Sequence, residues 1–448
     1  MTVSAAIAVD AGARFTRVAR VTADGRPVLA ELPGLLSEEG LPVPGRHGGD
    51  RDAALRAAYA AYVEHYGTPE RVVLVVPQQD RAGHVRRATD VLTELHRAGP
   101  VPHLRTLGTP HAVMALLRHA GTATAPSYAV CDLGATAAEV SVCSLAPGAV
   151  VVTGSARHAP AGGYGAGFDA AVLAGAGLPD DEAARRELAW ARAQEGAAQR
   201  IDTALERTAR RPGPRYESAV VHQVAGRPVT AGVVHRALDR LTGGLDRVLD
   251  EALTGQPAPP VAAVGGAARF GPLIRHLTGR QSAPVALPGG VDPALAAVFG
   301  AALVAAGQAD PADRYPYAVS VGTHRTVAGE LRAEALLISP AGALEPGGEA
   351  VFAETGGQRV RFRAGPAGPA GRTAARTVRI RVHDAEGGSG TPVGALSIPP
   401  GGEEERFHVG VRIADDGTAR LVLQPLGDGA PGEYPLGVLP TDLEGARS

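Results

Sequence analysis

Residues Ala5–Arg17 (AAIAVDAGARFTR) begin as an apolar run, pass through an Asp-x-Gly turn and continue as an alternating segment. This order predicts a buried strand, a tight turn and a return strand. The same order recurs at Tyr128–Ser141 (YAVCDLGATAAEVS), where Asp132 takes the place of Asp10. The repeat predicts two similar hairpins, far apart in the sequence, each with an aspartate at the end of its first strand.

An Asp-x-Gly turn of this kind can serve a phosphate site in two ways. Glycine lets the backbone approach a phosphate closely, so that N–H groups of the turn point at its oxygen atoms. The carboxylate can hold Mg²⁺ through bound water. Two such hairpins facing each other would clamp a polyphosphate from both sides. A single turn is more often an ordinary β-turn, so only the ordered set of motifs is informative.

The composition of the 448 residues is that of a folded protein, with 45% hydrophobic and 20% charged residues, and its length allows roughly two to four domains. The net charge of −2 gives no reason to expect nucleic acid or an anionic membrane as a partner. All 44 basic residues are arginine, so no step can use a lysine ammonium. The two cysteines, Cys131 and Cys143, are expected in the core. Asp10 interrupts the first apolar run and no run is long enough to span a bilayer, so we expect a cytoplasmic protein.

The first 300 residues alternate strand-like and helix-like segments. Val72–Val76 is predicted to be a buried strand, and a strand at Val261–Val264 runs into Gly265-Gly266. The Asp292-Pro293 pair is predicted to cap an alanine-rich helix. The periodicity predicts further helices over residues 52–66, 84–97, 109–119, 181–208 and 230–253.

The composition changes near residue 308. A polar linker is predicted over 308–314. Alternating runs without helical periodicity follow, at Tyr317–Val321, Val378–Val382, Phe407–Ile413 and Arg420–Leu423. They predict a β-sandwich over 315–440 and a tail over 441–448.

Taken in order, these motifs resemble the DnaK-type, seventy-kilodalton heat-shock chaperone family of the actin-like ATPase superfamily. Ala5–Arg17 and Tyr128–Ser141 are similar to its two phosphate loops, and Val264–Arg269 (VGGAAR) is similar to its adenosine motif VGGSTR. Weaker similarities keep the same order, at Val75–Pro77 with Arg86–Asp90, Thr109–Ala115, Gly163–Asp169 and Ala297–Ala302.

The resemblance continues into the last third of the chain. Val393–Pro400 (VGALSIPP) and Val411–Leu423 (VRIADDGTARLVL) resemble the core of the family's peptide-binding β-domain. The resemblance implies an α/β actin-like, ribonuclease H-like two-lobed nucleotide-binding domain over 1–307. A β-sandwich without a helical lid would follow it and bind a polypeptide.

Carried to the matching positions, the resemblance also implies site residues. Asp10 and Asp132 would hold Mg²⁺ through water, and both would act in catalysis with Glu139. The Arg269 guanidinium would stack on adenine. The residues implied to contact ATP or ADP are Gly12, Ala13, Arg14, Gly134, Ala135, Thr136, Gly165, Gly265, Gly266, Ala267 and Arg269.

Departures from the family pattern predict weak catalysis. Ala13 and Arg14 replace two threonines of the first loop, Glu139 replaces an aspartate, and Thr109 replaces a glutamate. The family's catalytic lysine is missing from an interval that is shorter here, so part of the first lobe is expected to be reduced. Because phosphoryl transfer depends on positioned charge, these changes should cost orders of magnitude in rate. Arg14 would either supply part of the lysine's charge or be a solvated loop residue.

We therefore expect a chaperone-like protein that binds ATP or ADP with Mg²⁺, has weak ATPase activity or none, and binds a polypeptide client. One alternative is an actin-fold small-molecule phosphotransferase or biosynthetic accessory enzyme. Another is a pseudo-ATPase that serves as an interaction scaffold. The sequence leaves the client and the oligomeric state open.

Overall fold

The computed structural model divides by its internal contacts into two compact units. Unit 1 comprises Met1–Asp80, Arg87–Ser144 and Gly154–Pro311, and unit 2 comprises Arg81–Arg86, Leu145–Thr153 and Ala312–Ser448. The main boundary falls inside the linker expected at 308–314, and the expected tail at 441–448 lies outside the described residues. The structure describes residues 6–32, 40–43, 50–79, 81–96, 102–146, 148–193, 196–255, 257–280, 284–363, 376–383, 390–398, 406–414, 417–427 and 429–440.

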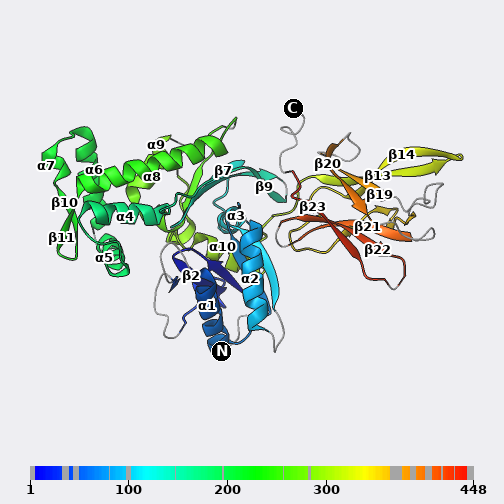
Figure 1. Cartoon of the computed structure of the whole chain (residues 1–448), viewed down its shortest axis with the longest axis horizontal. Helices are drawn as coiled ribbons and strands as arrows, with labels where there is room; N and C mark the ends of the chain where they lie inside the picture. The colour runs from blue at the N-terminus through cyan, green and yellow to red at the C-terminus, as the bar shows by residue number, and fades with distance from the viewer. Residues whose placement is uncertain are drawn as a thin grey trace. The chain divides into compact units, whose positions relative to one another are not determined.

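The first sheet of unit 1 is built around the first hairpin, β1 (Ala6–Ala11) and β2 (Phe15–Val21), whose strands are antiparallel (Figure 1). On the other side of β1 lies β5 (Arg71–Val76), parallel to it, and then β6 (His103–Gly108), parallel to β5. Two short strands pair with β2, β3 (Pro27–Leu29) and β4 (Leu41–Pro42). The aspartate of the first motif therefore lies near the end of a central strand.

The helices described with this sheet are α1 (Arg51–Tyr66), α2 (Arg81–Leu95), α3 (Thr109–His119) and α10 (Ala296–Ala305). Apolar side chains of β1, β5, α3 and α10 form one buried cluster. α10 packs closely on α3, because a Cβ on Gly300 would lie 1.9 Å from the Ala112 carbonyl oxygen. The cap prediction for α10 is wrong: the helix begins at Ala296, and Asp292 instead binds Arg269 and the Ala294 N–H.

The second sheet of unit 1 contains the second hairpin. Its strand order is β12-β7-β8-β9, with β7 (Ser127–Leu133) and β8 (Ala138–Ala146) antiparallel and β12 (Val261–Val264) parallel to β7. β9 (Ala149–His158) forms the other edge. In both sheets, therefore, a hairpin strand whose next-to-last residue is aspartate has a parallel neighbour on its other side.

Helices and a small hairpin complete this half of unit 1. The predicted block over 181–208 is two helices, because Gly196 takes a left-handed conformation (φ +71°) between them. The elements are α4 (Gly165–Gly175), α5 (Glu182–Ala193), α6 (Ala197–Arg210), α7 (Pro214–Glu217), β10 (Val220–Val224), β11 (Arg227–Thr230), α8 (Ala231–Ala252), η2 (Gly266–Arg269), α9 (Gly271–Arg280) and η3 (Pro288–Gly290).

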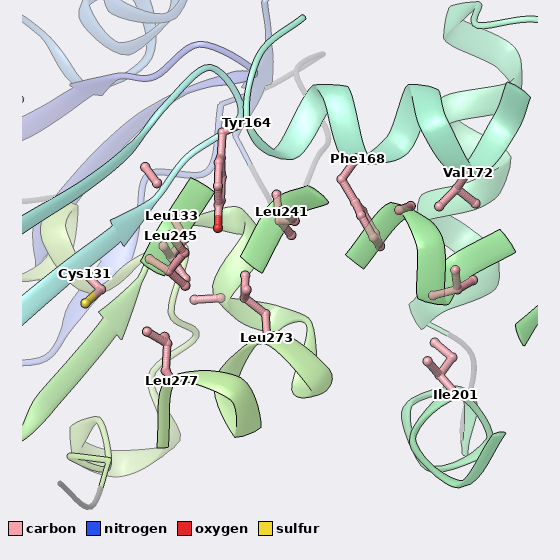
Figure 2. Packing of buried hydrophobic residues seen from close by; sticks show 14 of the residues in the cluster. Cys131, Leu133, Tyr164, Phe168, Val172, Ile201, Leu241, Leu245, Leu273 and Leu277 are labelled. Atoms are coloured by element: carbon pink, nitrogen blue, oxygen red, sulfur yellow. The ribbon is translucent and has the colours of Figure 1, made fainter. Parts of the chain in front are cut away.

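A hydrophobic cluster joins the second sheet to these helices. Figure 2 shows part of it, with Leu133 of β7, Leu245 of α8 and Leu273 of α9 close together. Cys131, on β7, and Cys143, on β8, are both fully buried, which confirms that they are core residues. Burial raises the pKa of each thiol to about 12, so neither is a reactive thiolate at neutral pH.

Unit 2 is built almost entirely of strands. One sheet has the order β14-β13-β19-β20 and the other the order β15-β21-β22-β23, with β18 also paired to β21. Buried side chains from both sheets, such as Val321, Ile380 and Val411, belong to one cluster, so the sheets share a core. The strands are β13 (Ala318–Val327), β14 (Glu330–Ser339), β15 (Val351–Phe352), β16 (Glu354–Thr355), β17 (Gln358–Arg359), β18 (Phe362–Arg363), β19 (Arg376–His383), β20 (Thr391–Ile398), β21 (Arg406–Ile413), β22 (Ala419–Pro425) and β23 (Gly432–Gly437).

Within the described part of the chain, no helix combines the length and the apolar character that crossing a membrane requires.

Candidate functional site

The ends of the two repeated hairpins lie close to each other within unit 1. The negative charge of Asp10 raises the pKa of Asp132, so the two carboxyl groups are within electrostatic reach. Strand register then brings in one further side chain from each hairpin: Arg17 is the cross-strand partner of Asp10, and Glu139 is that of Asp132. Cross-strand partners lie on the same face of a sheet. The structure therefore brings together Asp10, Asp132 and Glu139, the three residues expected to act in catalysis.

The third turn packs directly on the second hairpin. Gly265 is left-handed (φ +88°), and a Cβ there would lie 2.7 Å from both Asp132 Oδ1 and the Leu133 carbonyl oxygen. At the start of α4, a Cβ on Gly165 would lie 3.0 Å from the Gly134 carbonyl oxygen and 3.5 Å from Ala267 Cβ. Only glycine fits the approach at position 265, whereas a side chain at position 165 would require the Gly134 backbone to move slightly. Residues predicted from four separate motifs thus meet at one place.

The carboxyl groups of the site are shifted toward their protonated forms. Burial, Glu139 and Asp10 raise the pKa of Asp132 to about 7, while Arg17 and a hydrogen bond from Thr109 oppose the shift. Burial raises the pKa of Glu139 to about 7, although its carboxylate accepts a hydrogen bond from the Gln79 N–H at 3.0 Å. Burial also raises the pKa of Asp10, against the opposing effects of Arg17 and Arg51.

One arginine is paired with the aspartate of the first hairpin. Arg17 Nη1 donates to Asp10 Oδ2 at 3.3 Å, and the Arg17 side chain is only 9% exposed. The sequence prediction missed this pair. The pair could have been predicted from the sequence. A hairpin turn around Gly12 places residues 10 and 17 opposite each other, just as the turn around Gly134 places residues 132 and 139 opposite each other.

Two other arginines reach from the first hairpin and α1 to the second half of unit 1. Arg14 Nη1 donates to Asp169 Oδ2 at 3.0 Å, and Asp169 Oδ1 accepts from Arg192 Nη1 at 2.5 Å. Arg51 Nη2 donates to the Thr136 hydroxyl at 3.3 Å. Arg14 is thus paired with a buried carboxylate, while 41% of its own side chain remains exposed to solvent. Arg51 and Arg192 could not be found from sequence, because no local pattern links either residue to its partner.

The structure corrects the expected role of Gly134. Its N–H was expected to face a phosphate, but it donates within the turn to the Ala137 carbonyl at 2.9 Å. The Gly165 N–H donates to the Gly134 carbonyl at 3.2 Å, and the Gly265 N–H donates to the Pro293 carbonyl at 2.9 Å. In this conformation, these three N–H groups stabilise the turns instead of pointing at a ligand.

The remaining expected contact residues lie in the same three turns. The two hairpin turns contain Gly12, Ala13, Ala135 and Thr136. The short helix η2 begins with Gly266 and Ala267. Arg269 ends η2, where its Nε and Nη2 donate to the Asp292 carboxylate at 2.8 and 2.6 Å. This ion pair fixes the guanidinium, and stacking on adenine stays a prediction.

The donor set of the site does not favour a directly bound divalent ion. Among the described residues, no group of three or more histidine, cysteine, aspartate or glutamate side chains is arranged to hold a metal. Mg²⁺ prefers several oxygen ligands in octahedral geometry, and a guanidinium beside Asp10 repels a second cation. The Mg²⁺ expected from the resemblance stays an untested prediction that Arg17 argues against.

Comparison with known proteins does not assign the chain. No family model matches it, and no curated protein is significantly similar to it.

Proposed function

We propose that unit 1 is an actin-like nucleotide-binding domain, similar to that of DnaK-type chaperones, that binds ATP or ADP between its two sheets. One observation carries the proposal: Asp10 and Asp132 are the next-to-last residues of equivalent strands in two sheets whose hairpins meet. Arg14 of the first hairpin donates to Asp169 of α4, and Gly165 of α4 donates to Gly134 of the second hairpin. The packing of the Gly265 turn on Asp132 supports it, because the third expected motif then adjoins the other two.

The charges of the site support slow hydrolysis or none. Phosphoryl transfer is accelerated mainly by positioned charges around the attacking and leaving oxygens. Here Arg17 neutralises Asp10, and the pKa values of Asp132 and Glu139 are both raised to about 7. Thr109, which replaces a family glutamate, is a hydrogen-bond donor to Asp132 and supplies no carboxylate. The site is better suited to holding a nucleotide than to cleaving it.

We also propose that unit 2 binds a polypeptide partner and that the protein acts in the cytoplasm. The β14-β13-β19-β20 sheet of unit 2 has β14 and β20 as its edge strands, and each pairs with one strand of that sheet. An extended peptide can bind such an edge through main-chain hydrogen bonds. Binding of an unstructured peptide to the full chain, followed by fluorescence anisotropy, tests this part of the proposal.

A second candidate function is a pseudo-ATPase scaffold. The Arg14–Asp169 and Arg51–Thr136 bonds favour it, because they engage Arg14 and Thr136, two residues expected to contact the nucleotide. The N–H groups of Gly134 and Gly165 also favour the scaffold, because both already donate to backbone carbonyls. In this alternative, the protein binds partners in one fixed state.

Calorimetric titration with ATP and ADP distinguishes the candidates. A Cβ on Gly266 meets nothing within 4 Å, so Gly266→Leu should fold while filling the space expected for the nucleoside. The matched control is Gly243→Leu, at a helical position that is equally open. Binding by the wild type and by the control, lost in Gly266→Leu, supports nucleotide binding. Absence of binding in all three leaves the scaffold, and ADP release that requires a small-molecule acceptor would identify a phosphotransferase.

A further inference from the structure

The Arg17 guanidinium lies at the turn of the first hairpin, beside the aspartate expected to face a metal. Arg17 Nη1 is 3.3 Å from Asp10 Oδ2 and 3.9 Å from the point where a Cβ on Gly12 would lie. It therefore lies beside both the aspartate and the glycine of the Asp-x-Gly turn.

The fold is built to hold this side chain in place. A Cβ on Gly40 would lie 2.8 Å from Arg17 Cγ, and Gly40 is left-handed (φ +107°), so only glycine leaves room for the stem of Arg17. The guanidinium also lies over the Phe15 ring, 5.5 Å from its centroid. With 9% of the side chain exposed, Arg17 is a fixed internal charge and not a surface residue.

The field of this charge extends across the site. Arg17 lowers the pKa of Asp132 on the second hairpin and contributes to lowering that of Asp292 beside the third turn. Arg51 adds a second positive charge that acts on Asp10. Arginine also carries a permanent charge and a planar fork of donors that matches phosphate oxygens.

We infer that Arg17 takes the place of the divalent cation, so that this site binds a nucleoside polyphosphate without Mg²⁺. The inference rests on the proposed nucleotide-binding function and specifies which positive charge balances the bound polyphosphate. A divalent ion beside Asp10 would have to displace the Arg17 guanidinium from the carboxylate to which it donates. A phosphate is not repelled by the guanidinium, and it can share that group with Asp10 because arginine carries five N–H donors.

Titration of ATP in excess EDTA and in excess Mg²⁺ tests the inference on the full chain. The wild type should bind with the same affinity in both within about threefold. Arg17→Ser should lose at least about tenfold in EDTA, the loss of one charge-assisted hydrogen bond, and should regain affinity when Mg²⁺ is added. Arg20→Ser is the matched control, because it removes a guanidinium from the same strand that lies over Tyr66. Thermal unfolding of each variant checks that it is folded.

Each other outcome is decisive. ATP binding by the wild type only with Mg²⁺ overturns this inference and leaves the proposed function intact. Absence of binding in both conditions overturns the proposed function itself. Titration of Mn²⁺, followed by electron paramagnetic resonance, gives a readout that needs neither variant nor nucleotide: the wild type should leave Mn²⁺ free. Tight Mn²⁺ binding that Asp10→Asn abolishes would contradict the inference even if Arg17→Ser fails to fold.

Discussion

Glu139 lies directly opposite Asp132 in the β7–β8 ladder, so two carboxyl groups share one face of the same hairpin. In the first hairpin, the same seven-residue spacing places Arg17 opposite Asp10. Like charges directly opposite each other destabilise a strand pair, whereas opposite charges stabilise it. The two hairpins thus share one backbone arrangement, but the first pairs opposite charges and the second pairs two carboxyl groups. The Asp132–Glu139 pair should therefore lower the stability of unit 1 at neutral pH.

Replacing Asp132 by asparagine should therefore stabilise the protein above neutral pH. The folded pKa of about 7 exceeds the ordinary aspartate value of 3.8, so the folded state binds the proton more tightly than the unfolded state. The stability contributed by this group is fully present below pH 3.8 and is lost as the pH rises through 7. At pH 8 we expect Asp132→Asn to gain about 2 kcal/mol over the wild type, and near pH 4 to gain little.

Unfolding by denaturant, followed by the fluorescence of the single tryptophan, Trp190 in α5 of unit 1, measures this difference. Asp90→Asn, at an exposed position of α2, is the control and should change stability little at either pH. A wild type more stable than Asp132→Asn at pH 8 would show that the carboxylate is stabilised in the fold.

Replacing Gly265 by alanine should destabilise unit 1 by about 2 kcal/mol or more, because a left-handed alanine is strained and its Cβ would overlap Asp132 Oδ1. Gly266→Ala, one residue further along, is the matched control: its Cβ meets nothing within 4 Å, and Gly266 lies in the helical turn η2. Thermal unfolding of the two variants tests the contrast. Equal melting temperatures would mean that the Gly265 turn can move away from Asp132.

The sequence predicted those parts of the fold and site that depend on local patterns. The Asp-x-Gly hairpins were visible because apolar runs and glycines mark strands and turns, and hairpin register then fixes cross-strand partners such as Asp132 and Glu139. The Arg14–Asp169 pair spans 155 residues and leaves no local signal. The hydrogen bond of Gly134 within its own turn was missed for another reason: glycine permits both inward and outward N–H directions, and packing selects one.

Replacing Tyr164 by phenylalanine should stabilise unit 1 by about 1 kcal/mol. Its hydroxyl is buried and has no hydrogen-bond partner among the described residues. Figure 2 shows the ring extending from the start of α4, with its oxygen directed into the apolar cluster. An unsatisfied buried hydroxyl costs about 1–3 kcal/mol, part of which phenylalanine recovers. The control is Tyr128→Phe, which removes a hydroxyl that accepts from the Ala125 N–H at 2.7 Å and should destabilise. The Trp190 transition measures both, and destabilisation of similar size in the two variants would contradict the prediction.

The stability of unit 1 should fall in weak acid because of His222. This side chain, on β10, is 6% exposed, and burial together with Arg192 and Arg200 lowers its pKa to about 4, from 6.5. The unfolded state then binds the proton more tightly, so the stability that depends on neutral His222 is present above pH 6.5 and is lost as the pH falls toward 4. His222→Gln cannot be protonated and should lose about 2 kcal/mol less than the wild type between pH 7 and pH 4.5.

Denaturant unfolding at the two pH values checks this difference, and the other titrating groups cancel because they are common to both proteins. His103→Gln, at an exposed position of β6, should behave as the wild type does. Because β10 packs against α5, which carries Trp190, the fluorescence of that tryptophan follows the region in which the proton is taken up. Parallel loss of stability in the wild type and His222→Gln would show that a different group is responsible for acid sensitivity.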